Sequence, residues 1–405
     1  MIRILLLLIL SLSSVQAQEN QSRFYDVTFN GQFRPDRGVV EASISVQQSG
    51  GELIQLDLSA NAQRYSEFAG EGEIRREGNR LLWSVPPGGG TLSYEAIVDH
   101  ERGRKLDAQM TPEWAILRLD DVFPAARVRS LVGSRSRSSL ELNGPTGWRF
   151  ESRYGVVKGR LSFENPGRRY DRPTGWLAAG KLGVRRTTLE DRTVTVAAPR
   201  DQGMRRLDIL SFVRWTLPSL VQVFPDFPKQ LLIVGARDDM WRGGLSGPES
   251  VYLHADRPLV SENSTSPLLH ELVHLATAQS SANVADWIVE GLSEYYSLNV
   301  LLRSGGISQK RYERAIKSQV DWAKKDNGRL VSPSTGANTA RAVQCFESIQ
   351  KELGKNDAGS LDEVVQELLA SENADGKRLL ELVEAHLGRP SGGLRNFLKK
   401  YSETP

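Results

Sequence analysis

The sequence His270-Glu271-Leu272-Val273-His274 lies in an apolar run that predicts a helix. On an α-helix, positions i and i+4 are about 40° apart around the axis and about 6 Å apart along it, so both imidazoles project from one face. Glu271 lies roughly 100° round from His270. This spacing is typical of a zinc site in which the glutamate sits beside the metal and takes a proton from water. The pattern therefore predicts His270 and His274 as metal ligands and Glu271 as a general base.

A third donor lies in the next apolar segment, W-I-V-E-G-L-S-E-Y-Y at residues 287–296. Catalytic zinc takes three protein ligands and a water, so Glu290 is the predicted third ligand. Glu294 follows one helical turn later, where it can accept the free ring N–H of His270. Gly291 costs about 1 kcal/mol inside a helix, which predicts close packing, with the helix of His270 as the expected neighbour. A solvated acidic face is the alternative, but the segment is too apolar for one.

Together, H-E-L-V-H and W-I-V-E-G-L-S-E-Y-Y resemble the gluzincin clan, whose members pair H-E-x-x-H with a downstream E-G-x-x-E. Within it, the sequence is similar to the glycyl aminopeptidase-like family and more distantly to the aminopeptidase N family. The resemblance implies a zinc metallopeptidase with one zinc ion per chain, held by His270, His274 and Glu290, and with Glu271 as general base. Residues 275–289, 15 in all, separate the second histidine from the third ligand. A shorter connecting loop than in aminopeptidase N relatives is therefore expected.

The segment 243–253 resembles the edge strand that precedes the zinc helix in these families and binds the substrate backbone by β-addition. Gly244, Leu245 and Ser246 are therefore predicted to contact substrate. The glutamate that anchors the substrate amino terminus in aminopeptidases falls on Ser246, and Glu249, three residues later, is an alternative anchor. This change leaves amino-terminal trimming and internal cleavage both open.

A further departure concerns the donor to the tetrahedral oxyanion. Relatives carry Y-x-K-G-A where this chain has N-T-A-R-A-V, so their tyrosine corresponds to Asn338. An amide still donates a hydrogen bond, and one oxyanion donor is worth about 3 kcal/mol of barrier, so the change predicts slower turnover rather than none. Tyr295, Tyr296 and Tyr312 are alternative donors, although buried helix tyrosines more often belong to the core.

The first 17 residues predict a cleavable signal peptide. Arg3 gives a positive start, residues 4–12 an apolar core too short to span a bilayer, and Val15-Gln16-Ala17 a small-residue cleavage site. The mature chain is expected to begin at Gln18 and to be secreted or periplasmic. No later stretch is apolar over about 18 residues, so no transmembrane segment is expected after signal removal.

Composition adds little to the functional prediction. The formal net charge is +3 and 25% of the residues are charged, which is typical of a soluble protein and gives no reason to expect a nucleic-acid partner. The single cysteine, Cys345, forms no internal disulfide, so the fold must rest on its hydrophobic cores. A peptide or protein substrate is the expected partner, and the oligomeric state stays open.

The hydrophobic pattern changes near residue 200, from period-two alternation to helical periods. The predicted fold class is α+β, with an antiparallel β-sandwich domain over 18–198 followed by a mostly helical domain over 199–405, which the resemblance makes thermolysin-like. Strands are expected at 24–29, 39–46, 53–58, 81–85, 92–98, 184–196 and 230–235. Helices are expected at 205–223, from 267, at 286–305, 308–328, 339–353, 360–369, 378–387 and 393–401.

Two rival functions remain open. One is a catalytically weak cell-envelope binding protein that keeps zinc for structure, which the changes at Ser246 and Asn338 favour. The other is a zinc hydrolase that acts on a non-peptide amide or ester. The intact Glu271 favours an enzyme, because a structural zinc site takes four closed protein ligands and needs no base.

Overall fold

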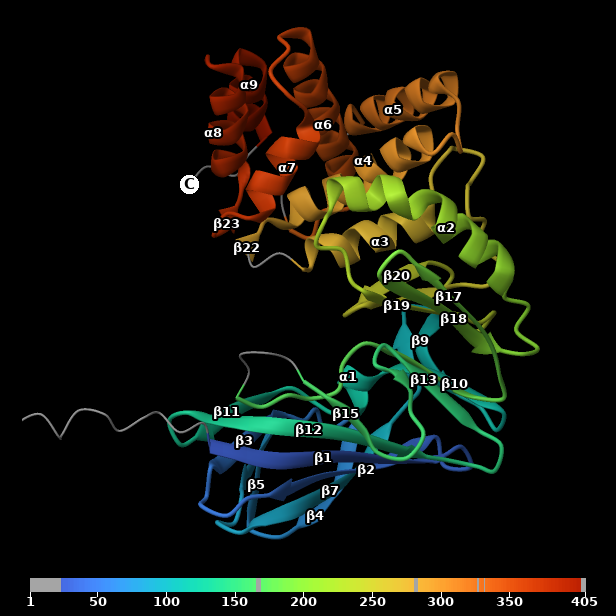
Figure 1. Ribbon diagram of the computed structural model, residues 1–405, viewed down its shortest axis with the longest axis vertical. Helices are drawn as coiled ribbons and strands as arrows, with labels where there is room; N and C mark the ends of the chain where they lie inside the picture. Colours follow the sequence, from blue (N-terminus) through green and yellow to red (C-terminus); the bar gives the residue numbers. More distant parts are fainter. Residues whose placement is uncertain (1–22, 165–168, 280–282, 326–327, 331, 402–405) are drawn as a thin grey trace, which may run out of the picture. The chain divides into compact units, whose positions relative to one another are not determined.

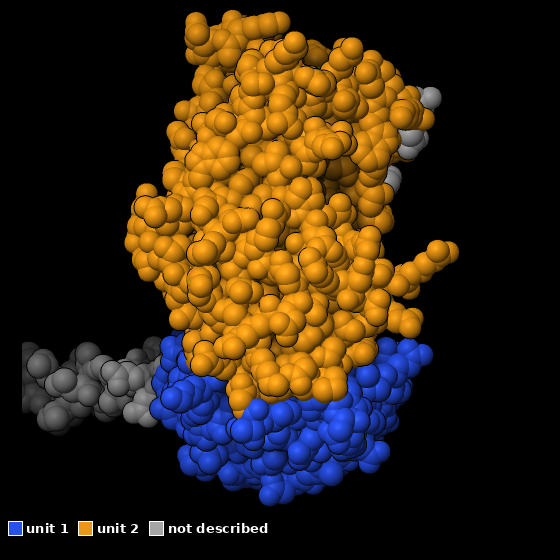
Figure 2. All heavy atoms as spheres, turned by 90° about the vertical axis from the view of Figure 1, so that its right-hand side faces the viewer, with its two compact units in different colours: residues 1–98, 119–146, 157–173 blue, residues 99–118, 147–156, 174–405 orange. Residues whose placement is uncertain are grey.

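The structure is a computed structural model in which residues 23–164, 169–279, 283–325, 328–330 and 332–401 are described (Figure 1). The predicted signal peptide lies outside these residues. The chain divides into two compact units (Figure 2). Unit 1 comprises residues 1–98, 119–146 and 157–173, and unit 2 comprises residues 99–118, 147–156 and 174–405.

Unit 1 is built from two β-sheets, whose strands bury alternate residues as the sequence pattern predicts. In β1, every second side chain from Tyr25 to Phe33 is buried. Most neighbours are antiparallel, but β1 and β12 are parallel. The six-stranded sheet has the order β15 (Leu161–Phe163), β12 (Ser134–Asn143), β1 (Arg23–Arg34), β2 (Val39–Gln47), β7 (Gly89–Ile97) and β4 (Tyr65–Gly70). The four-stranded sheet has the order β11 (Ala126–Ser130), β3 (Leu53–Ser59), β6 (Arg80–Ser84) and β5 (Glu73–Glu77), and α1 (Leu119–Val122) is a single turn.

Unit 2 also contains two larger sheets, which share a hydrophobic core that includes Ile116, Trp176, Val234 and Tyr252. The first has the order β14 (Gly155–Val156), β13 (Arg149–Ser152), β16 (Trp176–Gly180), β10 (Trp114–Arg118), β9 (Lys105–Met110) and β8 (His100–Arg102). The second has the order β17 (Leu182–Leu189), β18 (Arg192–Pro199), β19 (Gln230–Val234), β21 (Ser250–Leu253) and β20 (Gly244–Gly247). Its edge strand is therefore β20, the segment expected to contact substrate.

The two units interleave along the chain instead of meeting at the expected boundary near residue 198. Strand β18 pairs in parallel with β19 and antiparallel with β17, so the segment 182–199 belongs to the sheet that carries β20. Backbone pairing of this kind ties a strand to the sheet that satisfies its N–H and C=O groups. The sequence pattern did not predict β8, β9 and β10, which also belong to unit 2.

The carboxy-terminal part of unit 2 is helical, and the predicted α+β class, a β-domain followed by a helical region, is confirmed. No helix in the described ranges has the length and apolarity needed to cross a membrane. The helices are α2 (Arg206–Val223), α3 (Pro267–Thr277), α4 (Asp286–Arg303), α5 (Gln309–Ala323), α6 (Ala337–Lys355), α7 (Leu361–Leu369), α8 (Gly376–Leu387) and α9 (Gly392–Tyr401). A short parallel pair, β22 (Asn283–Val284) and β23 (Asn373–Ala374), completes the unit.

Gly291 allows α4 to approach a neighbour closely, but that neighbour is α6 rather than the expected α3. A Cβ atom at Gly291 would lie 2.5 Å from Ala342 Cβ and 2.8 Å from a ring carbon of Phe346. Both side chains are fully buried. Because a tightly packed core has no room for an added methyl group, only glycine fits at this position.

We predict that Gly291→Ala destabilises the protein by about 1 to 3 kcal/mol, since the added methyl group overpacks the contact between α4 and α6. The free energy of unfolding, measured in denaturant, tests this. The matched control is Gly354→Ala, also a helix glycine, whose Cβ would meet no atom within 4 Å. An equal loss of stability in both variants would contradict the packing argument.

Candidate metal centre and active site

The polar residues of helix α3 share one face, because its apolar residues pack into the core. The Ser266 side chain caps the helix by accepting a hydrogen bond from Leu269 N at 3.2 Å, and Pro267 occupies the first turn, as expected. The buried side chains are Leu268, Leu269, Leu272, Val273, Leu275, Ala276 and Thr277. The remaining face carries the two histidines and the glutamate of the motif.

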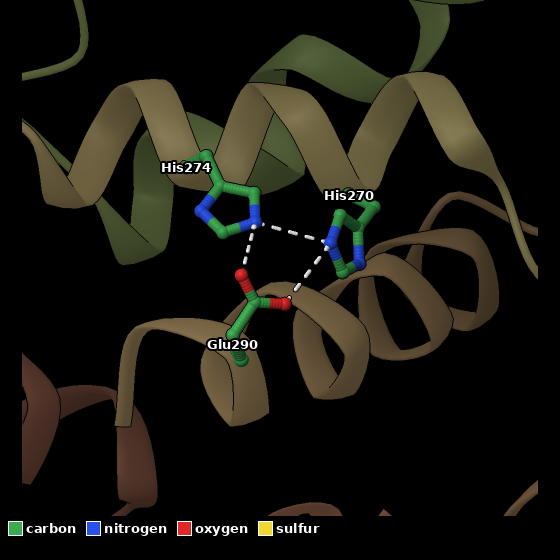
Figure 3. A group of neighbouring side chains, drawn as sticks. All are labelled: His270, His274 and Glu290. Carbon is green, nitrogen blue, oxygen red and sulfur yellow. Dashed lines mark hydrogen bonds and ion pairs between the residues drawn. The ribbon is translucent and has the colours of Figure 1, made fainter. Parts of the chain in front are cut away.

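The structure brings His270, His274 and Glu290 together (Figure 3). The Nε2 atoms of His270 and His274 are 3.1 Å apart. The Glu290 carboxylate lies 3.7 Å from His270 Nε2 through one oxygen and 3.4 Å from His274 Nε2 through the other. All three side chains are partly buried, with 22%, 16% and 29% of the side chain exposed, respectively.

These separations fit a tetrahedral zinc ion. Ligand atoms about 2.0 Å from such an ion lie roughly 3.3 Å from one another. Two imidazoles and one carboxylate also form the three-ligand set of a catalytic zinc, which leaves one position for water. The three donors therefore match zinc in chemistry and in spacing.

Glu294 orients the first histidine, and Gln319 orients Glu294 in turn. One carboxylate oxygen of Glu294 lies 3.3 Å from His270 Nδ1, so this nitrogen carries the proton and Nε2 keeps its lone pair for a metal. The other oxygen accepts a hydrogen bond from Gln319 Nε2 at 2.7 Å. Gln319 comes from α5 and was not predicted from the sequence, because no local pattern distinguishes it from the other polar residues of that helix.

The two histidines differ in their affinity for protons. Burial disfavours the charged form of His270, but the Glu294 hydrogen bond and the charges of nearby carboxylates outweigh it and raise the pKa of His270. Burial, together with the charge of His270, lowers the pKa of His274 to about 3. Burial also raises the pKa of Glu290. His274 is thus already in its metal-binding neutral form at neutral pH, whereas His270 binds a metal in competition with a proton.

Glu271 faces the edge strand β20. Its carboxylate accepts hydrogen bonds from the hydroxyl and the backbone N–H of Ser246. A Cβ atom at Gly244 would lie 2.5 Å from Glu271 Cγ, so the absence of a side chain at Gly244 gives the glutamate its space. Burial raises the pKa of Glu271, while the positive charge of Arg118 is among the influences that lower it. Glu271 is therefore partly desolvated and contacts both the side chain and the backbone of one residue of β20.

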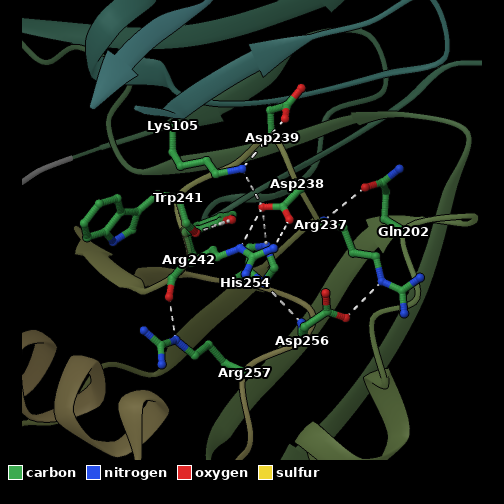
Figure 4. Close-up of polar contacts among 11 residues, drawn as sticks. Lys105, Gln202, Arg237, Asp238, Asp239, Trp241, Arg242, His254, Asp256 and Arg257 are labelled. Carbon is green, nitrogen blue, oxygen red and sulfur yellow. Dashed lines mark hydrogen bonds and ion pairs between the residues drawn. The ribbon is translucent and has the colours of Figure 1, made fainter. Parts of the chain in front are cut away.

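A polar network fixes the loop that leads into β20 (Figure 4). Lys105 of β9 binds the Asp238 carboxylate at 3.0 Å, and Arg242 binds the same carboxylate. These hydrogen bonds lower the pKa of Asp238. Beyond the loop, His254 N donates to Gly243 O at 3.0 Å. Because the loop is tied to β9 on one side and to the residue after β21 on the other, β20 has a fixed position beside Glu271.

Comparison with known proteins gives one family match. Residues 269–360 match the family model described as M61 glycyl aminopeptidase, and they include the motif, the third ligand candidate and the whole of α6. The predicted resemblance to metallopeptidases is confirmed. No curated protein sequence matches the chain.

Solved structures share the fold over nearly the whole chain. An aminopeptidase N family protein from Idiomarina loihiensis is 13% identical with a TM-score of 0.65, over 94% of this chain and 74% of that one. An M1 zinc metallopeptidase from Deinococcus radiodurans, solved as a variant bound to a Tyr-Ser-Ala substrate, is 15% identical with a TM-score of 0.59, over 95% of each chain. Leukotriene A4 hydrolase from Saccharomyces cerevisiae is 14% identical with a TM-score of 0.55, over 95% of this chain and 68% of that one.

The residues that were predicted to contact substrate lie in different surroundings. Gly244 and Ser246 lie against Glu271, as described above. The Leu245 carbonyl accepts a hydrogen bond from the indole N–H of Trp176 at 3.0 Å. Glu249, the alternative anchor for a substrate amine, lies in the turn after β20 and forms an ion pair with Arg153 at 2.6 Å. Its charge is therefore already matched within the protein.

The predicted oxyanion donors are mostly engaged elsewhere. Tyr296 donates its hydroxyl to Asp362 at 3.0 Å, and Tyr312 donates to Glu347 at 2.9 Å. Tyr295 is buried in the core with 1% of its surface exposed. Asn338 is buried in the first turn of α6, with 7% exposed. These tyrosines belong to the core of the helical region, which is the more common role of buried helix tyrosines.

We predict that Glu294→Gln changes both the strength and the pH dependence of zinc binding. Loss of the carboxylate partner of His270 should weaken zinc binding about tenfold or more at high pH. It should also lower the pKa of His270. The pH below which the affinity for zinc begins to fall should therefore move downward. Competition with a chelator between about pH 5.5 and 8.5, across the titration range of histidine, measures both effects.

The control is Glu313→Gln, which removes an exposed carboxylate from α5. It should leave the zinc titration unchanged. If the affinity for zinc began to fall at the same pH in Glu294→Gln and in the wild type, the assignment of Glu294 as the residue that raises the pKa of His270 would be wrong.

Proposed function

We propose that the chain is a zinc-dependent peptidase that hydrolyses peptide bonds with Glu271 as general base. The observation that carries this proposal is the meeting of His270, His274 and Glu290 around one point, with Glu271 on the adjacent helical position and held by β20. The family match over residues 269–360 and the peptidase folds of the solved structures support the same reaction class.

The three ligand candidates would hold one zinc ion, which supplies two effects when bound: it polarises the substrate carbonyl and lowers the pKa of a water. Glu271 takes one proton from the attacking water as the oxygen adds to the carbonyl carbon. The same carboxyl group then gives this proton to the nitrogen of the leaving amine as the C–N bond breaks. No covalent intermediate with the protein is required.

The surroundings of Glu271 suit this role. Partial desolvation raises its pKa toward the range in which a carboxylate both accepts and returns a proton. Ser246 restricts the carboxylate to one orientation through two hydrogen bonds. Positioning of this kind contributes to catalysis because the base need not be reoriented during the reaction.

We predict that Glu271→Gln lowers the rate of peptide cleavage about a thousandfold or more. Zinc binding should be retained, because Glu271 is not one of the three ligands. Cleavage of a mixed peptide library and zinc content per chain are measured on the mature protein and the variant. Ser246→Ala is the graded comparison: it removes one donor to the base and should lower kcat about tenfold, with full zinc.

The outcomes separate the rival functions. Stoichiometric zinc with no turnover in either protein would contradict the peptidase and favour the envelope binding protein. Turnover of amides or esters other than peptides would favour the second rival hydrolase. Absence of zinc from the wild type would remove the basis of all three.

We also propose that the protein acts outside the cytoplasm, on the basis of the signal-peptide pattern in residues 1–17. Sequencing the amino terminus of the protein from the periplasmic or culture fraction is expected to start at Gln18. Recovery of the protein with Met1 in the cytoplasmic fraction would contradict this.

A further inference from the structure

The carboxylates of the elements that form the site are all engaged. Strands β20 and β21, the turn between them, and helices α3 and α4 are fully described, and each acidic side chain on these segments has a partner. None of these side chains is left to bind a substrate ammonium group. The pairs are Glu249 with Arg153, Glu271 with Ser246, Asp286 with Ser334 N, Glu290 with the two histidines, and Glu294 with His270 and Gln319.

A cation, Arg118, lies next to the base. Arg118 is the last residue of β10, and its guanidinium donates a hydrogen bond to the carbonyl oxygen of Ser246 at 3.2 Å. Ser246 is the same residue whose hydroxyl and N–H bind Glu271. The charge of Arg118 acts directly on the Glu271 carboxylate. The guanidinium therefore belongs to the immediate surroundings of the catalytic base.

The position of this guanidinium is fixed by an aromatic ring. Arg118 lies over the ring of Trp176, with its central carbon 4.9 Å from the ring centroid. Trp176 is fully buried and donates its indole N–H to the Leu245 carbonyl. Stacking on a tryptophan that is itself bound to β20 holds the cation at this strand instead of letting it swing into solvent.

Arg118 forms no ion pair with a carboxylate in the described part of the chain, and the nearby acid that its charge acts on is Glu271. Its side chain is half-buried. A guanidinium has five N–H donors in a fork that matches carboxylate and carbonyl oxygens, and the Ser246 carbonyl occupies one of them. A cation in this setting attracts an anionic or carbonyl group of a ligand and repels an ammonium group.

We propose that Arg118 determines substrate specificity: the enzyme takes peptides that present an acidic side chain or a blocked amino terminus to β20, and rejects a free α-ammonium group there. This inference rests on the proposed peptidase function and deepens it. It makes internal cleavage of acidic peptides the preferred reaction over amino-terminal trimming. The glutamate that would anchor an amine is Ser246 in this chain, and Ser246 serves the base.

The test uses synthetic peptides that differ only in charge. A neutral peptide sequence is prepared with a free and with an acetylated amino terminus, and acetylated versions carry Asp, Asn or Lys on the amino side of the cleaved bond. For the wild type, kcat/KM should be about tenfold higher for the Asp than for the Lys peptide, and higher for the acetylated than for the free form. Arg118→Gln should remove both preferences, and Arg118→Glu should reverse them.

The controls separate charge from folding. Arg118→Lys keeps the charge and should keep the order of substrates. Arg185→Gln removes an exposed arginine from β17, the edge strand opposite β20 in the sheet that carries β20, and should change nothing. Zinc content of each variant shows whether the site has remained intact.

The proposal is overturned if the wild type prefers free-amine or Lys peptides, or if Arg118→Gln keeps the wild-type order. If the Arg118 variants do not fold, the wild-type order still tests the predicted specificity. If the zinc-loaded wild type cleaves no peptide, the proposed function fails, and calorimetric binding of the same Asp and Lys peptides to the wild type and to Arg118→Gln tests the role of Arg118.

Discussion

The close approach of α3 to α4 is the constraint on which the candidate site depends. It places Glu290 within 3.7 Å of His270 Nε2 and 3.4 Å of His274 Nε2, and it lets Glu294 reach the other nitrogen of His270. On a neighbouring face, α4 is held by α6, against which Gly291 packs without a side chain. The helices that carry the candidate metal donors are therefore positioned by hydrophobic packing, and Glu294 then orients His270 through a polar contact.

Strand β20 supplies the second half of the candidate site and contacts Glu271, the proposed base. Ser246 donates twice to Glu271, while its carbonyl accepts from Arg118. Trp176 binds the neighbouring carbonyl of Leu245, and a polar network holds the preceding loop. A strand at the edge of a sheet would otherwise be free to shift, so these contacts fix the position of β20 beside Glu271. The same contacts bring the Arg118 guanidinium to the Ser246 carbonyl, beside Glu271.

Local spacing predicted the features that depend on a single helix. His270 and His274 share a face of α3, and Glu290 and Glu294 share a face of α4, as the helical period requires. The division into a β-domain and a helical region also followed from hydrophobic periodicity. The contacts of Gln319 and Arg118 were not predictable, because these residues come from α5 and β10, and their partners depend on how distant elements pack. The neighbour of Gly291 was misassigned for the same reason.

We expect His270, His274 and Glu290 to hold one zinc ion. Anomalous diffraction from crystals of the zinc-loaded protein, recorded on both sides of the zinc absorption edge, would locate the ion. We predict one peak per chain, at about 2.0 to 2.2 Å from Nε2 of both histidines and from a Glu290 oxygen. A peak ligated by other residues, or no peak in a protein saturated with zinc, would contradict it.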